Sequence, residues 1–268
     1  MVILKLDGNG DIKNVYLFNR SVAMFRLSII DILKNILIQI PWVKSKAKKF
    51  HKTGILDNTE MVQNRVDELF KMMGDSSFSN ASVIEFGPGQ TSEIINALYK
   101  HKRFCKASVV DMVNYFTDDF WQNLGINFLY KNSYSVQKGS VDFIYAYDVL
   151  EHVLAPELFL RELRRIITAK GMIFLSWDFR DHLHLENEEN WFDMHKYSNI
   201  SWNMQMSNRS SYVNRLILSD WIKMFESVGL EVSKIETLKS TIASNAFEIK
   251  YGRKIDPTYR AKVLLRPI

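Results

Sequence analysis

The chain has 268 residues, 47% of them hydrophobic and 24% charged, which is enough for one sizeable core plus an appendage but not for two large domains. Its single cysteine, Cys105, excludes an internal disulfide framework and favours a reducing compartment. Residues 1–11 lack the pattern of a secretory signal, so we expect a cytoplasmic protein. The net charge of +5 is concentrated in basic clusters at 44–52 and 250–266, which are either solvated flanks or sites for phosphates or anionic lipid heads.

Residues 21–40 are predicted to form an amphipathic helix behind an N-terminal arm. On a helical wheel of about 100° per residue, the apolar arc consists of Ile29, Ile30, Ile32, Leu33, Ile36, Leu37 and Ile40. The opposite arc consists of Ser28, Asp31, Lys34, Asn35 and Gln39, and it is too polar to cross a bilayer. The helix is interpreted either as a lid on the main domain or as an interfacial helix at the inner face of an anionic membrane, with the following lysines on lipid phosphates.

From residue 58 onward, helix-like and strand-like segments alternate. Helices are predicted at 58–74, 91–99, 115–124, 156–168 and 220–228, and strands at 82–85, 107–111, 127–130, 141–145, 171–177, 230–237 and 246–251. This alternation predicts an α/β fold with a Rossmann-like, doubly wound sheet, mostly parallel, that closes in a C-terminal antiparallel hairpin. The expected domains are an arm and helices at 1–57, a main domain at 58–252 with a substrate lid at about 178–218, and a basic tail at 253–268.

A glycine turn follows the first strand of the main domain. The strand ends at Glu85, Gly87 and Gly89 follow, and a ligand can approach the backbone closely where no Cβ intervenes. The next strand ends at Asp111, twenty-two residues beyond Gly89, where a carboxylate can accept both ribose hydroxyls. A third close glycine is missing, and Glu85 and Glu93 would repel a phosphate. A cationic ligand such as S-adenosylmethionine therefore suits the turn better than NAD.

Several segments resemble the class I S-adenosylmethionine-dependent methyltransferases over roughly residues 60–250. They are the glycine turn from Glu85 to Thr91, the acid Asp111, the stretch from Ser140 to Val153 with its Leu-Glu-His, and the strand from Lys170 to Ser176. The resemblance implies that family's seven-strand sheet and S-adenosylmethionine as the cofactor.

The resemblance also implies roles for individual positions. The implied cofactor contacts are Glu85 near the ammonium, Gly87 and Gly89 at the methionine part, Asp111 on the ribose, Met112 on adenine, Asn132 or Ser133 at the adenine edge, and Tyr147 and Asp148 below the sulfonium. Glu151 and His152 have two interpretations: they either fix the turn in which they lie or contact a ligand directly.

The segment after the fifth strand is the expected source of a proton acceptor, which a hydroxyl acceptor needs in an in-line methyl transfer. His182 is the predicted base, oriented by Asp181 or Asp178, and His184 and His195 are the alternatives. The residues Asp181, His182, His184 and Glu186 are of metal-ligating types, but their spacing matches no strong ligand pattern, so no metal is expected.

Aromatic, amide and arginine residues further on suggest the acceptor site. Trp191, Tyr212, Asn214 and Arg215 suit a sugar, although the same mixture also makes a lid. The Asp-His after the fifth strand, Val213–Leu216 and Ser219–Trp221 are similar to a bacterial subgroup associated with surface-polysaccharide genes; Leu183 and Leu185 depart from its aromatic pattern. The resemblance implies O-methylation of a saccharide or polysaccharide precursor, free or lipid-linked. A small aromatic or lipid-like acceptor and a non-catalytic scaffolding subunit are the alternatives, and no nucleic-acid partner is expected.

Overall fold

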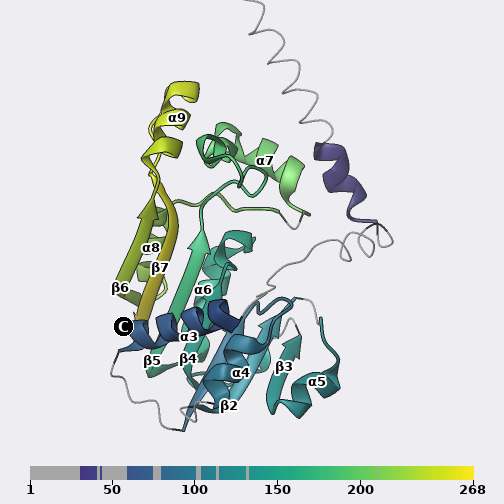
Figure 1. Cartoon of the computed structure of the whole chain (residues 1–268), viewed down its shortest axis with the longest axis vertical. Coiled ribbons are helices and arrows are strands. Elements are labelled where there is room, and N and C mark those ends of the chain that lie inside the picture. The colour runs from purple at the N-terminus through teal and green to yellow at the C-terminus, as the bar shows by residue number, and fades with distance from the viewer. Residues whose placement is uncertain are drawn as a thin grey trace, which may run out of the picture. The chain divides into compact units, whose positions relative to one another are not determined.

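The computed structural model describes residues 31–40, 43, 59–74, 80–100, 104–112, 115–130, 133–209 and 211–268. The chain divides into two compact units, each described by itself. The smaller unit comprises Met1–Phe50 and Tyr197–Tyr212, and the larger one comprises His51–Lys196 and Val213–Ile268. Figure 1 shows the helices and strands of the described residues.

The larger unit is built on a seven-stranded sheet in the order β3-β2-β1-β4-β5-β7-β6. Its strands are β1 (Ala81–Phe86), β2 (Phe104–Asp111), β3 (Ile126–Tyr130), β4 (Val141–Tyr147), β5 (Ile167–Asp178), β6 (Leu230–Lys239) and β7 (Thr258–Pro267). Strands β1 to β5 run parallel, and β7 lies antiparallel between β5 and β6. This confirms the predicted doubly wound sheet. Strand order reverses between β1 and β4, so a ligand crevice is expected at their carboxyl ends.

Helices cover both faces of the sheet (Figure 1). One face packs against α3 (Thr59–Met73), α4 (Glu93–Lys100) and α5 (Asp118–Asn123), and the other against α6 (Pro156–Ile166) and α8 (Leu218–Ser227). Successive strand residues point to opposite faces, so Val83 joins the first core and Ile84 the second. Short 3₁₀ turns are η1 (Ser133–Ser135), η2 (Leu150–His152), η3 (Glu188–Asn190) and η4 (Asp193–Lys196).

The predicted strand at 246–251 is wrong, because these residues lie in helix α9 (Thr241–Tyr251). The Ser240 hydroxyl oxygen caps this helix by accepting the Ala243 N–H at 2.9 Å. Ala243 and Phe247, one helical turn apart, form its buried face, and Gly252, with φ of +65°, ends it. Strands β6 and β7 are thus antiparallel neighbours separated by a helix, and not the predicted hairpin.

The last strand lies in residues 253–268, which were expected to be a basic tail. Ala261, Val263 and Leu265 alternate along β7 and are buried in the core. Arg260 and Lys262, on either side of Ala261, pair with the carboxylates of Asp148 and Glu68. The positive charge that suggested a solvated tail therefore belongs to a central strand.

The smaller unit contains a helical segment at 31–37, inside the predicted helix, and α7 (Asn199–Met206). The Asn35 amide donates to the Met204 carbonyl at 2.9 Å and accepts from the Asn208 N–H at 2.8 Å. Asp31 pairs with Arg209 at 3.0 Å. Asp31 and Asn35 therefore make the internal contacts of this helix, whereas Lys34 and Gln39 are exposed. The apolar residues Leu33, Ile36, Leu37 and Ile40 are exposed as well.

Residues 21–30 of the predicted helix and the lysines at 44–52 lie outside the described residues. Within the described ranges, every helix is too short or too polar to span a bilayer.

Candidate functional site

The glycine turn joins the carboxyl ends of β1 and β2. The Gly87 N–H donates to the Val110 carbonyl at 2.8 Å, and the Gly89 N–H donates to Asp111 Oδ2 at 3.0 Å. Both glycines have positive φ, +67° and +64°, a conformation that other residues rarely adopt. A Cβ on Gly87 would also lie 2.5 Å from Cγ2 of Val149. Glycine is thus needed at this position for packing against Val149 as well as for any ligand.

Glu85 lies buried at the end of β1, where the Tyr145 hydroxyl donates a 2.8 Å hydrogen bond to its Oε2 atom. Burial raises the pKa of Glu85 to about 8, against the lowering effects of the Tyr145 bond and the Arg65 charge. The carboxyl is therefore protonated at neutral pH. A cationic ligand nearby would favour its ionised form, so this position suits an ammonium and not a phosphate.

Three residues beyond β2, Met112, Asn132 and Ser133, were predicted to contact the adenine, and their surroundings differ. Met112 follows Asp111 and is 67% exposed, so its apolar side chain is available to cover a flat ring. Asn132 lies outside the described residues. Ser133 lies in η1, where its carbonyl accepts from Arg165 at 3.1 Å, and hydrogen bonds from Arg165 and Ser133 lower the pKa of Glu162. Ser133 is thus tied to α6.

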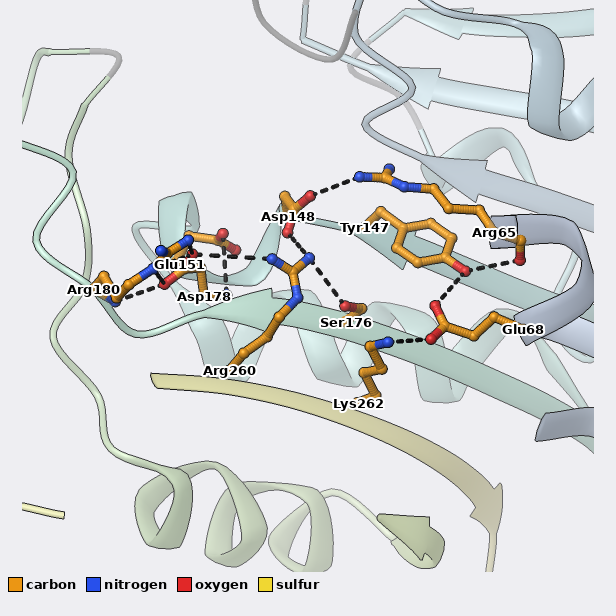
Figure 2. Close-up of polar contacts among 10 residues, drawn as sticks. All are labelled: Arg65, Glu68, Tyr147, Asp148, Glu151, Ser176, Asp178, Arg180, Arg260 and Lys262. Atoms are coloured by element: carbon orange, nitrogen blue, oxygen red, sulfur yellow. Dashed lines mark hydrogen bonds and ion pairs between the residues drawn. The ribbon is translucent and has the colours of Figure 1, made fainter. Parts of the chain in front are cut away.

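Asp148, directly after β4, has a left-handed backbone conformation, with φ of +55°. Its carboxylate binds two arginines. Arg65 Nη2 lies 3.2 Å from its Oδ2, and Arg260 Nη2 lies 2.5 Å from its Oδ1 (Figure 2). The Arg65 guanidinium also lies 4.5 Å from the centre of the Tyr147 ring. The Tyr147 hydroxyl is 3.1 Å from Glu68 Oε2. Tyr147 and Asp148 are therefore held by side chains from α3 and β7.

These partners of Tyr147 and Asp148 were not predicted from the sequence. Arg65 and Glu68 are three residues apart on α3, and Arg260 and Lys262, which pairs with Glu68, are two apart on β7. These spacings place each pair on one face of its element, a signal that was present in the sequence. The spacing alone does not identify the partners, because residues 253–268 were expected to be a tail and their place in the sheet was not known.

Arg180 organises the residues that follow β5. It forms a bidentate ion pair with Asp178, and its guanidinium lies 4.8 Å from the Trp191 ring centre. The Trp191 ring packs against Tyr259 at a tilt, with ring centres 4.9 Å apart, and its indole N–H donates to the Leu185 carbonyl at 2.9 Å. Trp191, predicted to contact the acceptor, is therefore part of an arginine–aromatic cluster that holds this segment.

Glu151, His152 and His182 form a cluster at the carboxyl ends of β4 and β5. Each offers one nitrogen or carboxylate oxygen, and these atoms lie within 4.8 Å of one another. The imidazole centres of His152 and His182 are 5.0 Å apart, and Glu151 Oε1 accepts the Asp178 N–H at 3.3 Å. Burial, followed by the nearby His152, lowers the pKa of His182 to about 4. Burial raises the pKa of Glu151 well above its ordinary value.

Asp181 was one of two residues predicted to orient His182, but its carboxylate has other partners. Its Oδ1 accepts the Leu183 N–H at 3.0 Å, and its Oδ2 lies 4.0 Å from Nε2 of His184. The carboxylate is buried and turned toward these partners because the chain bends tightly after residue 181. The charge of Asp178, the other predicted orienting residue, acts on the His182 imidazole.

The remaining predicted acceptor residues stabilise backbone turns. The Asn214 side-chain amide donates to the Leu150 and Val153 carbonyls at 2.7 and 3.3 Å, which fixes η2. Arg215 donates to the Met194 carbonyl at 3.1 Å. Tyr212 belongs to the smaller unit, where its N–H donates to the Arg209 carbonyl at 3.1 Å.

His195, an alternative base, is less suited to contact a ligand. Burial lowers its pKa to about 4, with the Arg215 and Arg253 charges adding to the effect. Its backbone carbonyl accepts from Arg253 at 2.8 Å, and its ring packs near Phe247.

Comparison with solved structures identifies the same fold in proteins of low sequence identity. A geranyl diphosphate methyltransferase in complex with GPP and sinefungin matches at 13% identity and a TM-score of 0.52, covering 77% of this chain and 78% of that one. Geranyl diphosphate C-methyltransferase from Streptomyces coelicolor A3(2) matches at 12% identity and a TM-score of 0.51, with 77% and 79% covered. The YcgJ protein from Bacillus subtilis matches at 14% identity and a TM-score of 0.50, with 77% and 99% covered. A search of curated proteins by sequence finds no match.

A family model described as "Methyltransferase domain" matches residues 59–235, which is more than half of the chain. The match spans the glycine turn, the acid that ends β2 and the Leu-Glu-His turn after β4. The chain therefore belongs to the methyltransferase-domain family and is an S-adenosylmethionine-dependent methyltransferase.

Proposed function

We propose that this methyltransferase transfers the methyl group to an oxygen acceptor, and that the acceptor is a saccharide or a polysaccharide precursor. The observation that carries the proposal is the cluster of Glu151, His152 and His182 at the carboxyl ends of β4 and β5. A hydroxyl must lose its proton during methyl transfer, and this cluster offers two imidazoles and a carboxyl group to manage it.

In this proposal, S-adenosylmethionine supplies the electrophilic methyl group on its sulfonium. Gly87 and Gly89 present backbone to the methionine part, and Glu85 lies toward the ammonium. Asp111 holds the ribose while its Oδ2 accepts from Gly89, and the exposed Met112 covers the adenine. Asn132 and Ser133 are assigned to the adenine edge, which for Ser133 requires release from its contacts with α6.

Tyr147 and Asp148 are assigned to the wall below the sulfonium. Arg65 and Arg260 hold the Asp148 carboxylate in position.

His182 is the residue to which we assign the acceptor proton. Its segment is fixed by Asp181, whose N–H donates to the Trp191 carbonyl at 2.7 Å and whose carboxylate accepts from Leu183. Asp181 therefore acts as a positioning residue. The Asp178 charge favours the imidazolium that forms on proton uptake.

The acceptor side is assigned to Trp191 and Arg215 of the larger unit, where Asn214 fixes η2. A saccharide is supported by the aromatic and arginine side chains that follow β5, since a sugar stacks its apolar face on a ring and bonds its hydroxyls to polar groups. O-methylation of a small aromatic or lipid-like metabolite is the alternative within enzymes, and a cofactor-binding scaffold is the alternative outside them.

Labelled methyl transfer tests these assignments. The full chain is incubated with methyl-labelled S-adenosylmethionine and separate panels of nucleotide sugars, lipid-linked sugars, phenols, and carbon or nitrogen nucleophiles. Label on a sugar oxygen, lost in His182→Ala but kept in His184→Ala, supports the proposal. Transfer only to carbon or nitrogen acceptors overturns the oxygen assignment. Cofactor binding without transfer to any panel favours the scaffold.

We also propose that the smaller unit docks on an anionic membrane surface, which would bring a lipid-linked acceptor to the enzyme. Leu33, Ile36 and Leu37 are 52%, 55% and 50% exposed on one side of the helical segment at 31–37. Its polar side is already occupied by the contacts of Asp31 and Asn35. The sequence at 44–52 adds five lysines directly after this helix. An apolar helix face that is followed in the sequence by lysines fits a bilayer interface of acidic lipids.

Vesicle sedimentation tests the docking surface. The chain should bind phosphatidylglycerol vesicles and lose most of that binding in the double variant Ile36→Ser, Leu37→Ser. Ile249→Ser, which changes an 85% exposed isoleucine on α9, is the matched control and should bind normally. Absence of vesicle binding by the intact chain overturns the proposal and favours the lid interpretation.

A further inference from the structure

Glu151 has a buried carboxyl oxygen with no hydrogen-bond partner within the part of the chain that the structure describes. The residue is 1% exposed; its Oε1 accepts the Asp178 N–H, and Oε2 is the unpartnered atom. A buried polar atom left unsatisfied destabilises the folded state, so this oxygen calls for a partner. The carboxylates of Asp178 and Asp181 are also buried, but each has a donor, in Arg180 and Leu183.

Two imidazoles adjoin this carboxyl group. His152 follows Glu151 within η2, and His182 comes from the segment after β5, so neighbouring strand ends bring the three together. One ligating atom from each lies within 4.8 Å of the others. Metal–ligand bonds of about 2.1 Å place ligand atoms no more than about 4.2 Å apart, so modest side-chain rotations would bring the cluster to binding geometry.

We propose that Glu151, His152 and His182 bind a divalent transition-metal cation. Two imidazoles and one carboxylate favour cations such as Zn²⁺, Co²⁺, Fe²⁺ or Mn²⁺ over Mg²⁺ and Ca²⁺, which prefer oxygen ligands. Three protein ligands leave coordination positions open for an oxygen of a small molecule. No metal was expected from the sequence, because the metal-ligating residue types at 181–186 have a spacing that matches no strong ligand pattern. The cluster instead draws two of its ligands from η2, about thirty residues earlier.

The surrounding hydrogen bonds hold the ligands in place, as is usual around metal centres. The Asp178 N–H fixes one Glu151 oxygen, and the Asn214 N–H donates to the Glu151 carbonyl at 2.8 Å. The Asn214 side chain fixes both ends of the same turn through Leu150 and Val153. Asn214 is thus a positioning residue for the proposed site.

This inference deepens the proposed function and rests on it for the role of the cation. A hydroxyl of the acceptor coordinated to the cation has a lowered pKa, so its O–H bond breaks with the proton passing to water. The resulting oxygen attacks the methyl carbon, and the carbon–sulfur bond breaks with its electron pair going to sulfur. In the metal-loaded protein His182 then serves as a ligand, which replaces direct proton transfer to its ring.

Cobalt binding tests the site independently of turnover. Tag-free full chain is stripped with EDTA, dialysed and titrated with Co²⁺, and the visible absorption of the bound ion is recorded. We expect one Co²⁺ per chain, displaceable by Zn²⁺, and at least a tenfold weaker affinity in Glu151→Gln and in His182→Ala. His184→Ala, which changes an exposed histidine outside the cluster, is the control and should bind like the parent. No stoichiometric binding by the parent, or equal binding by all variants, overturns the site.

Methyl transfer by the same stripped samples separates the two proposals. Circular dichroism first establishes that each variant is folded; should Glu151→Gln unfold, His152→Gln takes its place. S-adenosylmethionine-dependent methyl transfer to oxygen that survives complete metal removal overturns the role of the cation and leaves the proposed function standing. Stoichiometric Co²⁺ binding with transfer only to carbon or nitrogen leaves the cation site standing and overturns the oxygen acceptor.

Discussion

The Tyr145 hydroxyl lies 2.8 Å from the Glu85 carboxyl in the buried layer where β1 and β4 run side by side. Because burial raises the pKa of Glu85 to about 8, the cofactor-free protein carries a neutral acid at this position at pH 7. A bound ammonium favours the carboxylate and lowers this pKa. Binding therefore releases a proton, and affinity rises with pH between the bound-state pKa and about 8.

Calorimetry at pH 7 in buffers of different ionisation enthalpy measures this proton. We expect the parent to release more protons on binding S-adenosylmethionine than Glu85→Gln does, by up to one per site. Titration of the cofactor's own ammonium is common to both proteins and cancels in the comparison. Tyr145→Phe, which keeps the acid, should still release the proton. Equal release by the parent and Glu85→Gln would remove Glu85 from the ammonium site.

The same carboxyl group should make the stability of the cofactor-free protein depend on pH. Its pKa in the folded state, about 8, lies above the ordinary value of 4.5, so the folded state binds more protons than the unfolded state between these values. Its contribution to stability is therefore complete below pH 4.5 and is lost as pH rises through 8. Urea unfolding from pH 5 to pH 8.5 should show Glu85→Gln gaining stability relative to the parent as pH rises. A constant difference would contradict the raised pKa.

Gly87 should tolerate no side chain, for two separable reasons. Its φ of +67° costs alanine about 1–2 kcal/mol, and the 2.5 Å approach to Val149 adds an overpacking cost of about 1–3 kcal/mol. Gly139→Ala, at φ of +62° with nothing within 4 Å of its Cβ, is the control for strain alone. Urea unfolding should show Gly87→Ala losing more stability than Gly139→Ala. In a Val149→Ala background, the stability loss caused by Gly87→Ala should be smaller, because the clash with Val149 is removed. An unchanged loss would mean that Val149 moves aside freely.

The sequence predicted the architecture as far as β6, because buried strands and amphipathic helices there have clear periods of 2 and 3.6 residues. It failed at the C-terminus. Residues 246–251 read as a strand, yet the Ser240 cap and Gly252 make them the end of a helix. In β7, Arg260 and Lys262 alternate with buried apolar residues, and their carboxylate partners lie far away along the chain.

For the site, the sequence located the glycine turn and Asp111 because strand ends carry local signals. Asp181, predicted to orient His182, accepts from the Leu183 N–H, whereas the His182 ring lies beside His152, since a bend between adjacent residues directs their side chains to different partners. Asn214 was expected to meet the acceptor, whereas its bonds to η2 join segments more than sixty residues apart. Contacts of this kind depend on the paths of the loops above the sheet, which cannot be predicted from the spacing of residues in the sequence.

Asp148 and Arg260 should be energetically coupled. Asparagine tolerates the left-handed backbone of Asp148, so Asp148→Asn removes the charge with little strain, and Arg260→Met keeps the aliphatic stem. Because the Asp148 side chain is 37% exposed, we expect a coupling of about 0.5–1 kcal/mol in a double-mutant cycle. The Arg65 pair, longer at 3.2 Å, should couple less. A larger coupling to Arg65 would mean that it is the main anchor of Asp148.

Asn214 provides a final test, because a positioning residue and an acceptor contact respond differently to truncation. Asn214→Ala leaves the Leu150 and Val153 carbonyls without this donor, so we expect a loss of about 1–3 kcal/mol in urea unfolding. Turnover should fall because η2 carries Glu151 and His152, while KM for the acceptor changes little. Asn190→Ala, which removes only an exposed contact with Lys250, is the control and should leave both quantities nearly unchanged. Unaltered stability with a raised KM would restore Asn214 as a direct acceptor contact.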